Sequence, residues 1–491
     1  MANWIDKIIG TISPKWGYYR EAWTQSTEQL RNYDAGDYGR LNANWRPSNE
    51  SAELTDRYNR DTVRARARDL ERNSDIANSI IGAYKRNVIG GGFNLQARTE
   101  NEDINQEIEA LWKIWIKKHN CYVTETQSFS QIIRMAVERK KVDGGMLIHK
   151  CFTTGGILPF KLQCLEVDEL DISQMIPHKG GNRVVGGIEV NNYNKADGYW
   201  IKQRTTDGID LGQSVFVPQK DMIFLFSKKR PSQIREISDL APTITRVRDA
   251  NEFMTAVSVK ERILSCLAVF VKRAIPGGMG GAGRFVGGGD DNQYNYNGKT
   301  LTPGMIKNLN PGDDVVAINP SGQSGDATTF IKLMQRLIGA GQGISYEATS
   351  RDMSESNYSS TRQGIIEDDL TYSEDCDLIT EVMDEIYETF IISAVLAGKL
   401  KIKDFWQNKD KYMSHEWIKA PKKWIDPLKE SNANRIAMMT GQKTFQQISA
   451  EAGRDWREQI DDMAEALQYA NKKGVELGGV LLHEQKSNKK E

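Results

Sequence analysis

One helical pattern in this sequence is unusually long. Between Ser359 and about Leu396, apolar side chains recur at steps of three and four residues, the spacing of one face of an α-helix. They are Ile365, Ile366, Leu370, Leu378, Ile379, Val382, Met383, Ile386, Phe390 and Ile391. At 1.5 Å per residue, such a helix is more than about 50 Å long. Its length indicates an element that spans several layers or belongs to an oligomer.

Most of the remaining chain also has a helical period. The pattern predicts helices over residues 63–88, 99–116, 128–137, 242–273, 327–340 and 427–469. Gly90 to Gly92 end the first of these, and Thr99 with Glu102 has capping-box spacing at the start of the second. Pro242 suits the first turn of the fourth.

Between Met146 and Phe226 the period changes. Short runs rich in β-branched and aromatic residues are separated by glycine- and asparagine-containing breaks. The runs are residues 146–152, 160–167, 184–190, 199–203, 214–217 and 222–226. The predicted fold class is therefore mainly α with a small antiparallel β region, an α+β protein.

Four segments predict irregular structure or a brief strand. Residues 1–55 are polar and rich in Tyr, Trp, Asn and Gly, which is typical of an irregular arm. Residues 274–300 are saturated with glycine and indicate a loop at an extremity. A short strand is predicted over Val315–Ile318, and the charged tail Ser487–Glu491 is predicted to be disordered.

Charge is balanced over the 491 residues, with 65 Lys and Arg against 66 Asp and Glu. A protein that grips nucleic acid tightly is usually basic, because neutralising phosphates supplies most of the affinity. This chain therefore either does not contact nucleic acid or contacts it without binding it tightly. One helix face is locally basic: Arg60, Arg64, Arg66, Arg68 and Arg72 alternate with Asp61, Asp69 and Glu71. It is either a surface for DNA or a partner, or a solvated face with internal ion pairs, and the second is favoured.

The cysteines and the hydropathy pattern indicate a protein made in the cytoplasm. The five cysteines are odd in number and lack C-x-x-C spacing, which predicts buried thiols in a reducing compartment. The first sixteen residues lack a secretory apolar region. The longest apolar run, near Ile263 to Val271, is far shorter than the roughly 20 residues that span a bilayer.

Several enzyme motifs are missing or out of context. Gly278, Gly280 and Gly283 fit G-x-G-x-x-G but follow a predicted helix, and Gly298-Lys299-Thr300 lacks the earlier glycine of a P-loop. The five histidines are scattered, without metal-ligand spacing, so no cofactor or metal is expected. The acidic doublets read as surface pairs; they are Asp290-Asp291, Asp313-Asp314, Asp368-Asp369 and Asp461-Asp462.

An ordered series of short motifs resembles the lambda-type family of phage portal proteins. In the second half they are Gly343-Ile344-Ser345-Tyr346-Glu347, Ser350-Arg351-Asp352, Asn357-Tyr358-Ser359-Ser360 with Arg362, Trp417, Trp424 to Glu430, Thr440-Gly441 and Gly453-Arg454-Asp455. In the first half they are Ala65 to Leu70 with Asn73, and Val88-Ile89-Gly90. Each motif alone is weakly specific, and their order and spacing over most of the chain carry the resemblance.

The resemblance implies a homo-oligomeric ring, normally of twelve subunits, that passes double-stranded DNA at one capsid vertex. It implies a terminase motor, a head–tail adaptor and the major capsid or scaffolding protein as partners, with no membrane and no catalysis. The implied parts are an arm (1–55), a wing (56–240), a stem helix (241–273), a clip (274–325), a second stem helix (326–348), a tunnel loop (349–358), a long helix returning to the wing (359–420), and a crown with its tail (421–491).

The same resemblance implies two sets of site residues. The DNA channel would be lined by Arg351, Asp352, Ser354, Glu355, Ser356, Asn357, Arg362 and Lys332. Partners would dock on the clip at Arg284, Asp290, Asp291, Tyr294, Tyr296 and Lys299. A polar loop of mixed charge suits a conduit, because its acids keep each phosphate contact brief.

Two other functions stay open on the residues alone. One is a different oligomeric virion protein, from a tail or baseplate, without a DNA channel. The other is a nucleic-acid enzyme that uses the acidic doublets, which would need carboxylates converging on metal ions from separate elements.

Overall fold

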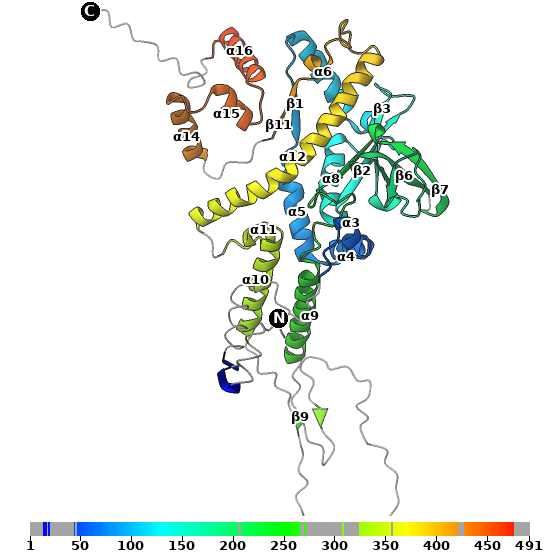
Figure 1. The fold of residues 1–491 in the computed structure, drawn as a ribbon. Helices are drawn as coiled ribbons and strands as arrows, with labels where there is room; N and C mark the ends of the chain where they lie inside the picture. Colours follow the sequence, from blue (N-terminus) through cyan, green and yellow to red (C-terminus); the bar gives the residue numbers. More distant parts are fainter. Residues whose placement is uncertain are drawn as a thin grey trace, which may run out of the picture. The chain divides into compact units, whose positions relative to one another are not determined.

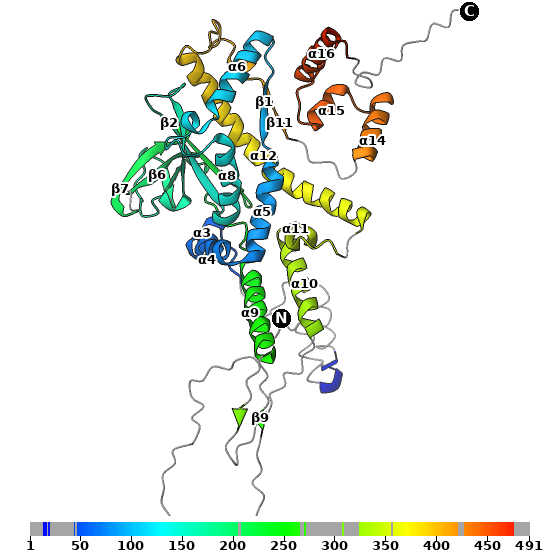
Figure 2. The same cartoon turned by 180° about the vertical axis from the view of Figure 1, so that it is seen from behind.

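The computed structural model describes residues 13–16, 18–19, 44, 47–204, 208–265, 270–271, 307–308, 324–354, 357–420 and 427–475. The chain divides into two units, residues 1–55 and 56–491. Helix α3 (Ala52–Asp56) lies at the division. The elements and contacts described below belong to the second unit (Figures 1 and 2).

The first predicted helix is two helices, α4 (Arg60–Asn73) and α5 (Asp75–Ile89). Ser74 between them has an extended backbone, with φ −123° and ψ 122°, and its hydroxyl accepts a hydrogen bond from the N–H of Ala77 at 3.3 Å. A serine in this role caps a new helix. The prediction of one continuous helix was therefore wrong, because apolar spacing continues across the break while the backbone does not.

Two further helices begin after polar caps. α6 (Glu102–Trp115) is capped by Asn101, and the predicted cap Thr99 instead binds the side chain of Asn105. α8 (Phe129–Asp143) follows Ser128 as predicted, and Gln131 accepts a hydrogen bond from the Ser128 N–H at 2.8 Å. The short helix α7 (Lys118–Cys121) joins them.

The predicted β region consists of two antiparallel sheets. In the first, β2 (Gly145–Phe152) lies between β3 (Phe160–Leu165) and β8 (Met222–Phe226). The second has the order β4 (Arg183–Val185), β5 (Ile188–Val190), β6 (Ala196–Arg204) and β7 (Asp210–Pro218). Short 3₁₀ turns at Val167–Glu169 and Gln219–Asp221 join strands. The first sheet lies beside α8 in Figures 1 and 2.

A two-stranded antiparallel sheet, β1 (Phe93–Ala97) with β11 (His415–Lys419), was not predicted. Its strands are more than 300 positions apart in the chain, so no local pattern joins them. Asp384 holds β11 against the long helix by accepting hydrogen bonds from His415 Nε2 at 3.0 Å and from Trp417 Nε1 at 2.7 Å.

The main core is organised around two tryptophans of α6. Trp115 stacks on Phe160 of β3, with ring centroids 5.3 Å apart, and its indole N–H donates to the Phe160 carbonyl at 3.0 Å. Trp112 packs edge-on against Phe129 of α8 and Phe390 of the long helix. Aromatic pairs of this geometry add to the gain from burial. Helices α6 and α8, strand β3 and the end of the long helix therefore share one core.

The long helix, α12 (Tyr358–Leu396), agrees closely with its prediction. Its two halves differ in burial. From Tyr372 onward the apolar stripe is covered by the core, whereas Ile365, Ile366 and Leu370 are exposed. Leu370 keeps 62% of its surface in solvent. The apolar stripe of α12 therefore extends past the part of the helix that the core buries.

Helices α9 (Ile244–Ser265) and α10 (Ser324–Gly341) lie side by side (Figures 1 and 2), with the rings of Phe253 and Phe330 4.6 Å apart. The prediction that α9 continues to Arg273 was wrong. Phe270–Val271 form a strand, β9, paired in parallel with β10 (Lys307–Asn308). Aromatic and β-branched residues favour a strand there. Residues 272–306 and 309–323, with the predicted strand at 315–318, lie outside the described residues.

The predicted C-terminal helical segment is three helices, α14 (Pro427–Met439), α15 (Phe445–Glu451) and α16 (Trp456–Lys473). Gly441 and Gly453, both with positive φ, lie in the turns between them. α16 contacts α6 through the ion pairs Arg457–Glu102 at 2.7 Å and Lys113–Glu458 at 3.5 Å. A short helix, α13 (Lys409–Tyr412), precedes β11.

The solvated face that was favoured for the arginines of α4 is present only in part: Arg66 and Arg72 are exposed and Arg68 is half-buried. Arg60 and Arg64 are buried. Arg64 pairs with Glu236 at 3.0 Å and Asp168 at 2.8 Å, and Arg60 donates to the Glu236 carbonyl at 2.9 Å. Glu236 is itself fully buried. The predicted ion pairs are present, but those of Arg60 and Arg64 tie α4 to the segment before α9, so these two arginines are not available to DNA.

A second buried ionic cluster joins four parts of the fold. Lys140 of α8 lies 2.9 Å from Asp239, before α9, and 2.5 Å from Asp375 of α12. Burial alone would lower the pKa of Lys140, but the two carboxylates raise it. The Asp239 carbonyl also accepts from Gln342, after α10, at 3.1 Å. We call Lys140, Asp239 and Asp375 the buried joint.

The adjacent lysine lies in a different environment. Burial lowers the pKa of Lys141 to about 8, and its ammonium lies 3.4 Å from the centroid of the Tyr84 ring. Its distance to Asp239 is 3.9 Å. Lys141 is thus a weaker partner of the joint than Lys140.

We expect Lys140→Met to lower the free energy of unfolding by about 3–5 kcal/mol, because the largely buried Asp375 loses its counter-charge while Asp239 keeps Lys229 at 2.9 Å and Lys141 at 3.9 Å. Urea denaturation measures the change, and Lys141→Met is the matched control, for which we expect less than half the loss. Equal, small losses in both variants would show that Lys140 is not the residue that holds the joint.

Candidate functional site

The candidate site begins where α10 turns sharply into α11 (Tyr346–Ser350). A Cβ on Gly339 would lie 2.7 Å from Thr349 Oγ1 and 2.9 Å from the Ile344 carbonyl. Gly343 has φ +71°, a conformation that glycine adopts without strain. The two glycines allow α11 to fold back against the end of α10.

The start of α11 is fastened to the long helix by charge-assisted hydrogen bonds. Ser345 donates to Asp368 of α12 twice, from its N–H at 2.6 Å and from its hydroxyl at 2.7 Å. Thr371 donates to the Gly343 carbonyl at 2.7 Å. Burial raises the pKa of Asp368, although both bonds from Ser345 oppose the rise. We call Ser345, Asp368, Gly343 and Thr371 the clasp.

A short polar loop connects α11 to α12. Arg351 ends α11 in the left-handed region, with φ 59° and ψ 19°, and its N–H donates to the Glu347 carbonyl. Asp352 accepts from the Ser354 N–H at 3.0 Å and the Tyr346 hydroxyl at 3.1 Å. The bonds from Ser354, then Tyr346 and the nearby Lys332 of α10, lower the pKa of Asp352. The carboxylate therefore stays ionised and fixed to α11.

The loop ends on a second cap. Asn357 accepts a hydrogen bond from the Ser360 N–H at 2.9 Å, which satisfies an otherwise free donor at the start of α12. On the α10 side, the Arg336 guanidinium lies 5.3 Å from the centroid of the Tyr346 ring. The clasp and this cap therefore fix both ends of the connection between α11 and α12.

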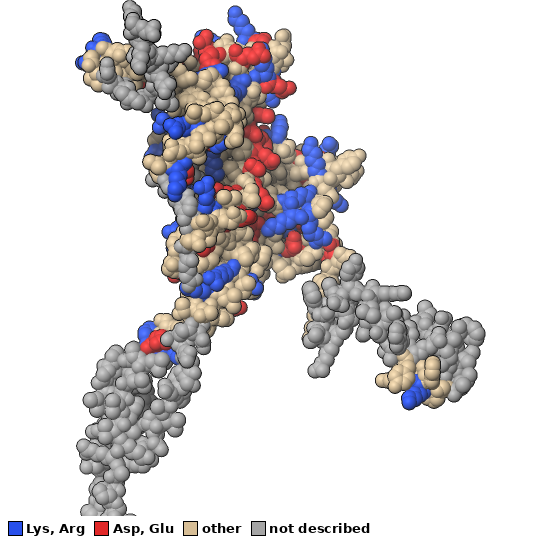
Figure 3. All heavy atoms as spheres, turned by 90° about the vertical axis from the view of Figure 1, so that its left-hand side faces the viewer, with Lys and Arg blue, Asp and Glu red and all other residues tan. Residues whose placement is uncertain are grey.

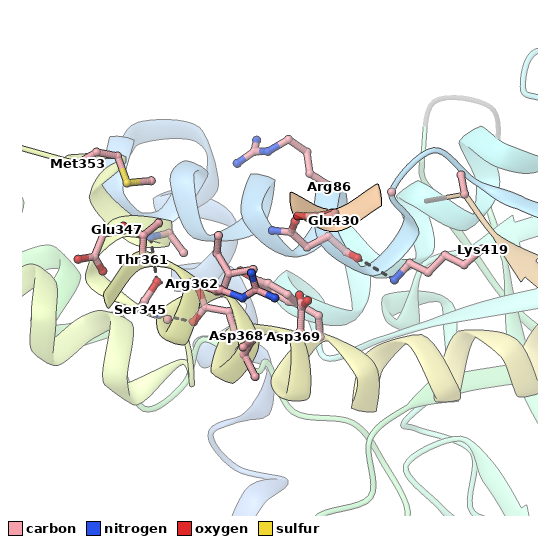
Figure 4. Close-up of a pocket in the computed structure, with 18 of the residues that line it drawn as sticks. Arg86, Ser345, Glu347, Met353, Thr361, Arg362, Asp368, Asp369, Lys419 and Glu430 are labelled. Carbon is pink, nitrogen blue, oxygen red and sulfur yellow. Dashed lines mark hydrogen bonds between the residues drawn. The ribbon is translucent and has the colours of Figure 1, made fainter. Parts of the chain in front are cut away.

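Beside the loop lies a groove of about 720 Å³ between α5, the first half of α12 and β11 (Figure 4). Its lining mixes apolar side chains with both signs of charge. The charged members are Arg86, Glu347, Arg362, Asp368, Asp369, Lys419, Glu430 and Glu451. Lys419 is held by its hydrogen bond to the Asn87 carbonyl at 2.9 Å. We call this hollow the groove.

The structure brings together part of the predicted channel set. Arg351, Asp352, Ser354 and Asn357 share the loop, Lys332 faces Asp352 from α10, and Arg362 lines the groove from α12. Their contact with DNA stays a prediction. Glu355 and Ser356 lie outside the described residues, and so do all the predicted docking residues: Arg284, Asp290, Asp291, Tyr294, Tyr296 and Lys299.

Sequence reasoning missed three residues of this region. Arg86 and Lys419 reach the groove from α5 and β11, which are distant in the sequence. Asp368 was placed on the surface with Asp369, and this was wrong because Asp368 is buried in the clasp. Its spacing from Tyr372, Asp375 and Ile379, buried on the same side of α12, was a signal for an inward position.

Charges on the described surface are mixed. Figure 3 shows Lys and Arg side chains interspersed with Asp and Glu over one face of the molecule. Within the described ranges, no group of three or more His, Cys, Asp or Glu side chains is placed to hold a metal ion. Among the helices described, none combines the length and apolar character needed to cross a bilayer.

The mainly helical fold, its small antiparallel sheets and this helix–loop–helix site agree with one known class of virion protein. The family model described as phage portal protein, lambda family, matches residues 38–375, and the chain belongs to that family.

Three relatives match nearly the whole chain. The probable portal protein of Halomonas phage phiHAP-1 is 24% identical over 91% of this chain and 88% of its own length. The portal protein of Escherichia phage N15 is 21% identical, covering 86% and 87%. Portal protein B of Escherichia phage lambda is 20% identical, covering 88% and 89%.

Solved structures with some likeness come from gene transfer agent particles. A chain in the neck of an empty particle gives a TM-score of 0.40 at 12% identity, with 79% of this chain and 93% of that chain covered. A chain of the native virion gives 0.38 at 11% identity, with the same coverage.

We expect Asp368→Asn to lower the free energy of unfolding by about 1.5–3 kcal/mol, since the bonds from Ser345 lose their charged acceptor. The loop should also be cleaved faster by a protease that cuts after arginine, because its fixed end is released. Asp369→Asn makes the same chemical change one position away and serves as control. Unchanged stability and unchanged cleavage in Asp368→Asn would refute the clasp.

Proposed function

We propose that this chain assembles into a closed ring of about twelve subunits that passes double-stranded DNA during packaging and ejection. The ring would occupy one capsid vertex and have no catalytic activity of its own. Its partners would be the terminase large subunit, a head–tail adaptor, and the major capsid or scaffolding protein. Membership of the portal family and the near-complete coverage of the portal relatives support this proposal.

The described elements can be assigned to parts of such a subunit. Residues 56–240, with both sheets, would be the wing, and α9 and α10 the stem. Residues 274–325 would form the clip that docks the motor and later the adaptor. Residues 349–358 would be the tunnel loop, α12 would return to the wing, and α14 to α16 would belong to the crown.

One observation in the structure carries the assembly proposal: apolar helix faces that this chain leaves uncovered. On α10, Leu333 keeps 51% and Leu337 42% of its surface exposed, beside the residues that pack on α9. On α12 the first half of the stripe is also exposed. A helix face whose apolar side chains are only partly covered by the same chain is typical of an interaction surface. In a ring each subunit uses two different patches, so neighbours would cover these faces.

The loop supports a channel that DNA slides through. Arg351 offers a cation, while Asp352, Ser354 and Asn357 offer an acid and small polar groups. Such a mixture gives phosphates brief contacts and keeps each one weak. The balanced charge of the whole chain agrees with a conduit that does not retain DNA.

We expect negative-stain electron microscopy of purified protein to show closed rings with a central hole. Leu333→Gln with Leu337→Gln should prevent ring closure and leave the folded subunit intact, because both side chains are already exposed. Leu211→Gln, on β7 and 54% exposed, is the matched control and should form normal rings. A compact small oligomer without a hole in the unaltered protein would contradict the proposal and favour another virion protein.

We expect Arg351→Ala with Arg362→Ala to permit ring assembly but to impair DNA packaging or retention, because the proposed channel lining loses one cation of the loop and one of α12. Nuclease-protected DNA per particle measures this, and Arg66→Ala, an exposed arginine of α4, is the control. Normal packaging by the double variant would remove the channel assignment of the loop.

A further inference from the structure

The chain changes direction where the long helix ends. The Lys399 N–H donates to the Ala394 carbonyl at 2.9 Å, and residues 397–408 connect α12 to α13 in a segment that we call the basic turn. Burial alternates along its first part, because Leu400 is buried and Ile402 half-buried between three exposed lysines: Lys399, Lys401 and Lys403. The lysine side chains therefore point to solvent.

Within the described part of the chain, the ammonium groups of these three lysines are unpaired. Two lysines a few residues later differ: Lys409 pairs with Glu388 at 3.8 Å, and Lys411 pairs with Glu100 at 2.5 Å. The dipole of α12 accounts for at most the nearest cation, because its effect is confined to the last turn of the helix. The basic turn therefore presents a group of cations without counter-charges of their own.

Two acids of the same segment do not cancel this charge. Asp404 accepts hydrogen bonds from the Tyr412 hydroxyl and from Asn408, both at 2.8 Å, and these bonds lower its pKa and fix the turn. Asp410 is exposed in the first turn of α13. Even with both carboxylates ionised, the three unpaired lysines leave the surface of the turn net positive.

The basic turn also exposes a tryptophan. Trp406 keeps 61% of its surface in solvent, and its ring packs edge-on against the fully buried Phe405, with ring centroids 5.1 Å apart. Just before the turn, Leu396 at the end of α12 is 70% exposed. Apolar side chains exposed together mark interaction surfaces, and tryptophan is among the residues that contribute most to binding a partner.

The basic turn is remote from the candidate site. The 39 residues of α12 separate it from the loop after α11, a distance on the order of 55 Å. Figures 1 and 2 show the chain leaving α12 at the end away from α11. DNA held by that loop, and the neighbours that would cover α10 and the first half of α12, therefore leave the basic turn open to a different partner.

We propose that the basic turn binds an acidic segment of another polypeptide, one that also carries an apolar or aromatic side chain. The carboxylates would pair with Lys399, Lys401 and Lys403, and the apolar side chain would pack on Trp406 and Leu396. A DNA duplex fits less well, because its backbone offers phosphates to the lysines but no apolar side chain to the indole. Identifying the partner as a virion protein rests on the proposed function, whereas the binding itself does not require a ring.

The first test measures charge recognition with the full chain. The probe is a fluorescently labelled copolymer of glutamate and tyrosine, and its binding is followed by fluorescence anisotropy. We expect Lys399→Gln with Lys401→Gln and Lys403→Gln to keep the Tm of the unaltered protein, because all three side chains are exposed. The same variant should bind the copolymer roughly tenfold more weakly.

A matched control removes the same charge elsewhere. Lys179→Gln with Lys195→Gln and Lys228→Gln changes three other exposed lysines and should bind the copolymer as the unaltered protein does. Equal weakening in both triple variants would show diffuse attraction to the whole surface and overturn the site.

The second test separates the aromatic contact from charge. Trp406→Ser should weaken binding of the copolymer roughly tenfold and leave binding of polyglutamate unchanged, since polyglutamate has no group for the indole. Tyr193→Ser, which removes an aromatic ring that is 92% exposed elsewhere, is the control. Equal losses for both polymers in Trp406→Ser would overturn the role of Trp406.

A competing duplex decides the class of partner. Short duplex DNA that displaces the copolymer as well as unlabelled copolymer does, at equal charge concentration, would assign the turn to nucleic acid and overturn the proposal. Closed rings that bind no copolymer would refute this site alone. Copolymer binding that depends on the three lysines and Trp406, in a protein that forms no rings, would refute the proposed function and leave this site standing.

Discussion

The Lys140 ammonium fixes the arrangement on which the candidate site depends. It bridges Asp239, just before α9, and Asp375 on α12, while the Asp239 carbonyl receives Gln342 from the turn after α10. The start of α9 and the end of α10 are thereby fixed against the long helix. A buried charge is unfavourable unless its partners are well placed, so the joint stabilises one arrangement and penalises others. The clasp then adds a second connection one to two turns earlier on α12.

The division of α12 into a covered and an uncovered half links fold to function. The covered half belongs to the aromatic core around Trp112 and Trp115, which keeps it fixed. The uncovered half carries the clasp, the groove and the start of the loop. A rigid helix therefore carries the start of a small polar loop, while exposed leucines and isoleucines beside it are free to contact the neighbouring subunits of the proposed ring. This arrangement suits a subunit whose site is completed by assembly.

Positive and negative charges occur together in the whole chain, in the groove and in the buried ion pairs. Net charge is −1, the groove combines acids with bases, and Arg64 of α4 is neutralised inside the fold. In the proposed ring, this balance of charge would give DNA phosphates brief contacts in place of tight binding.

The sequence by itself determined the fold class, the long helix to within one residue at its start, most strands of the β region, and the family. These follow from local periodicity and from ordered motifs, which need no knowledge of distant contacts. Tertiary structure alone decided the rest. Ser74 separates α4 from α5 although the apolar spacing continues across both helices. The break depends on the backbone conformation of Ser74, which apolar spacing does not reveal. β1 pairs with β11 across more than 300 residues. Asp368, Arg64 and Lys140 look like surface charges in the sequence, since a buried charge is recognised only when its counter-charges, from separate elements, are seen beside it.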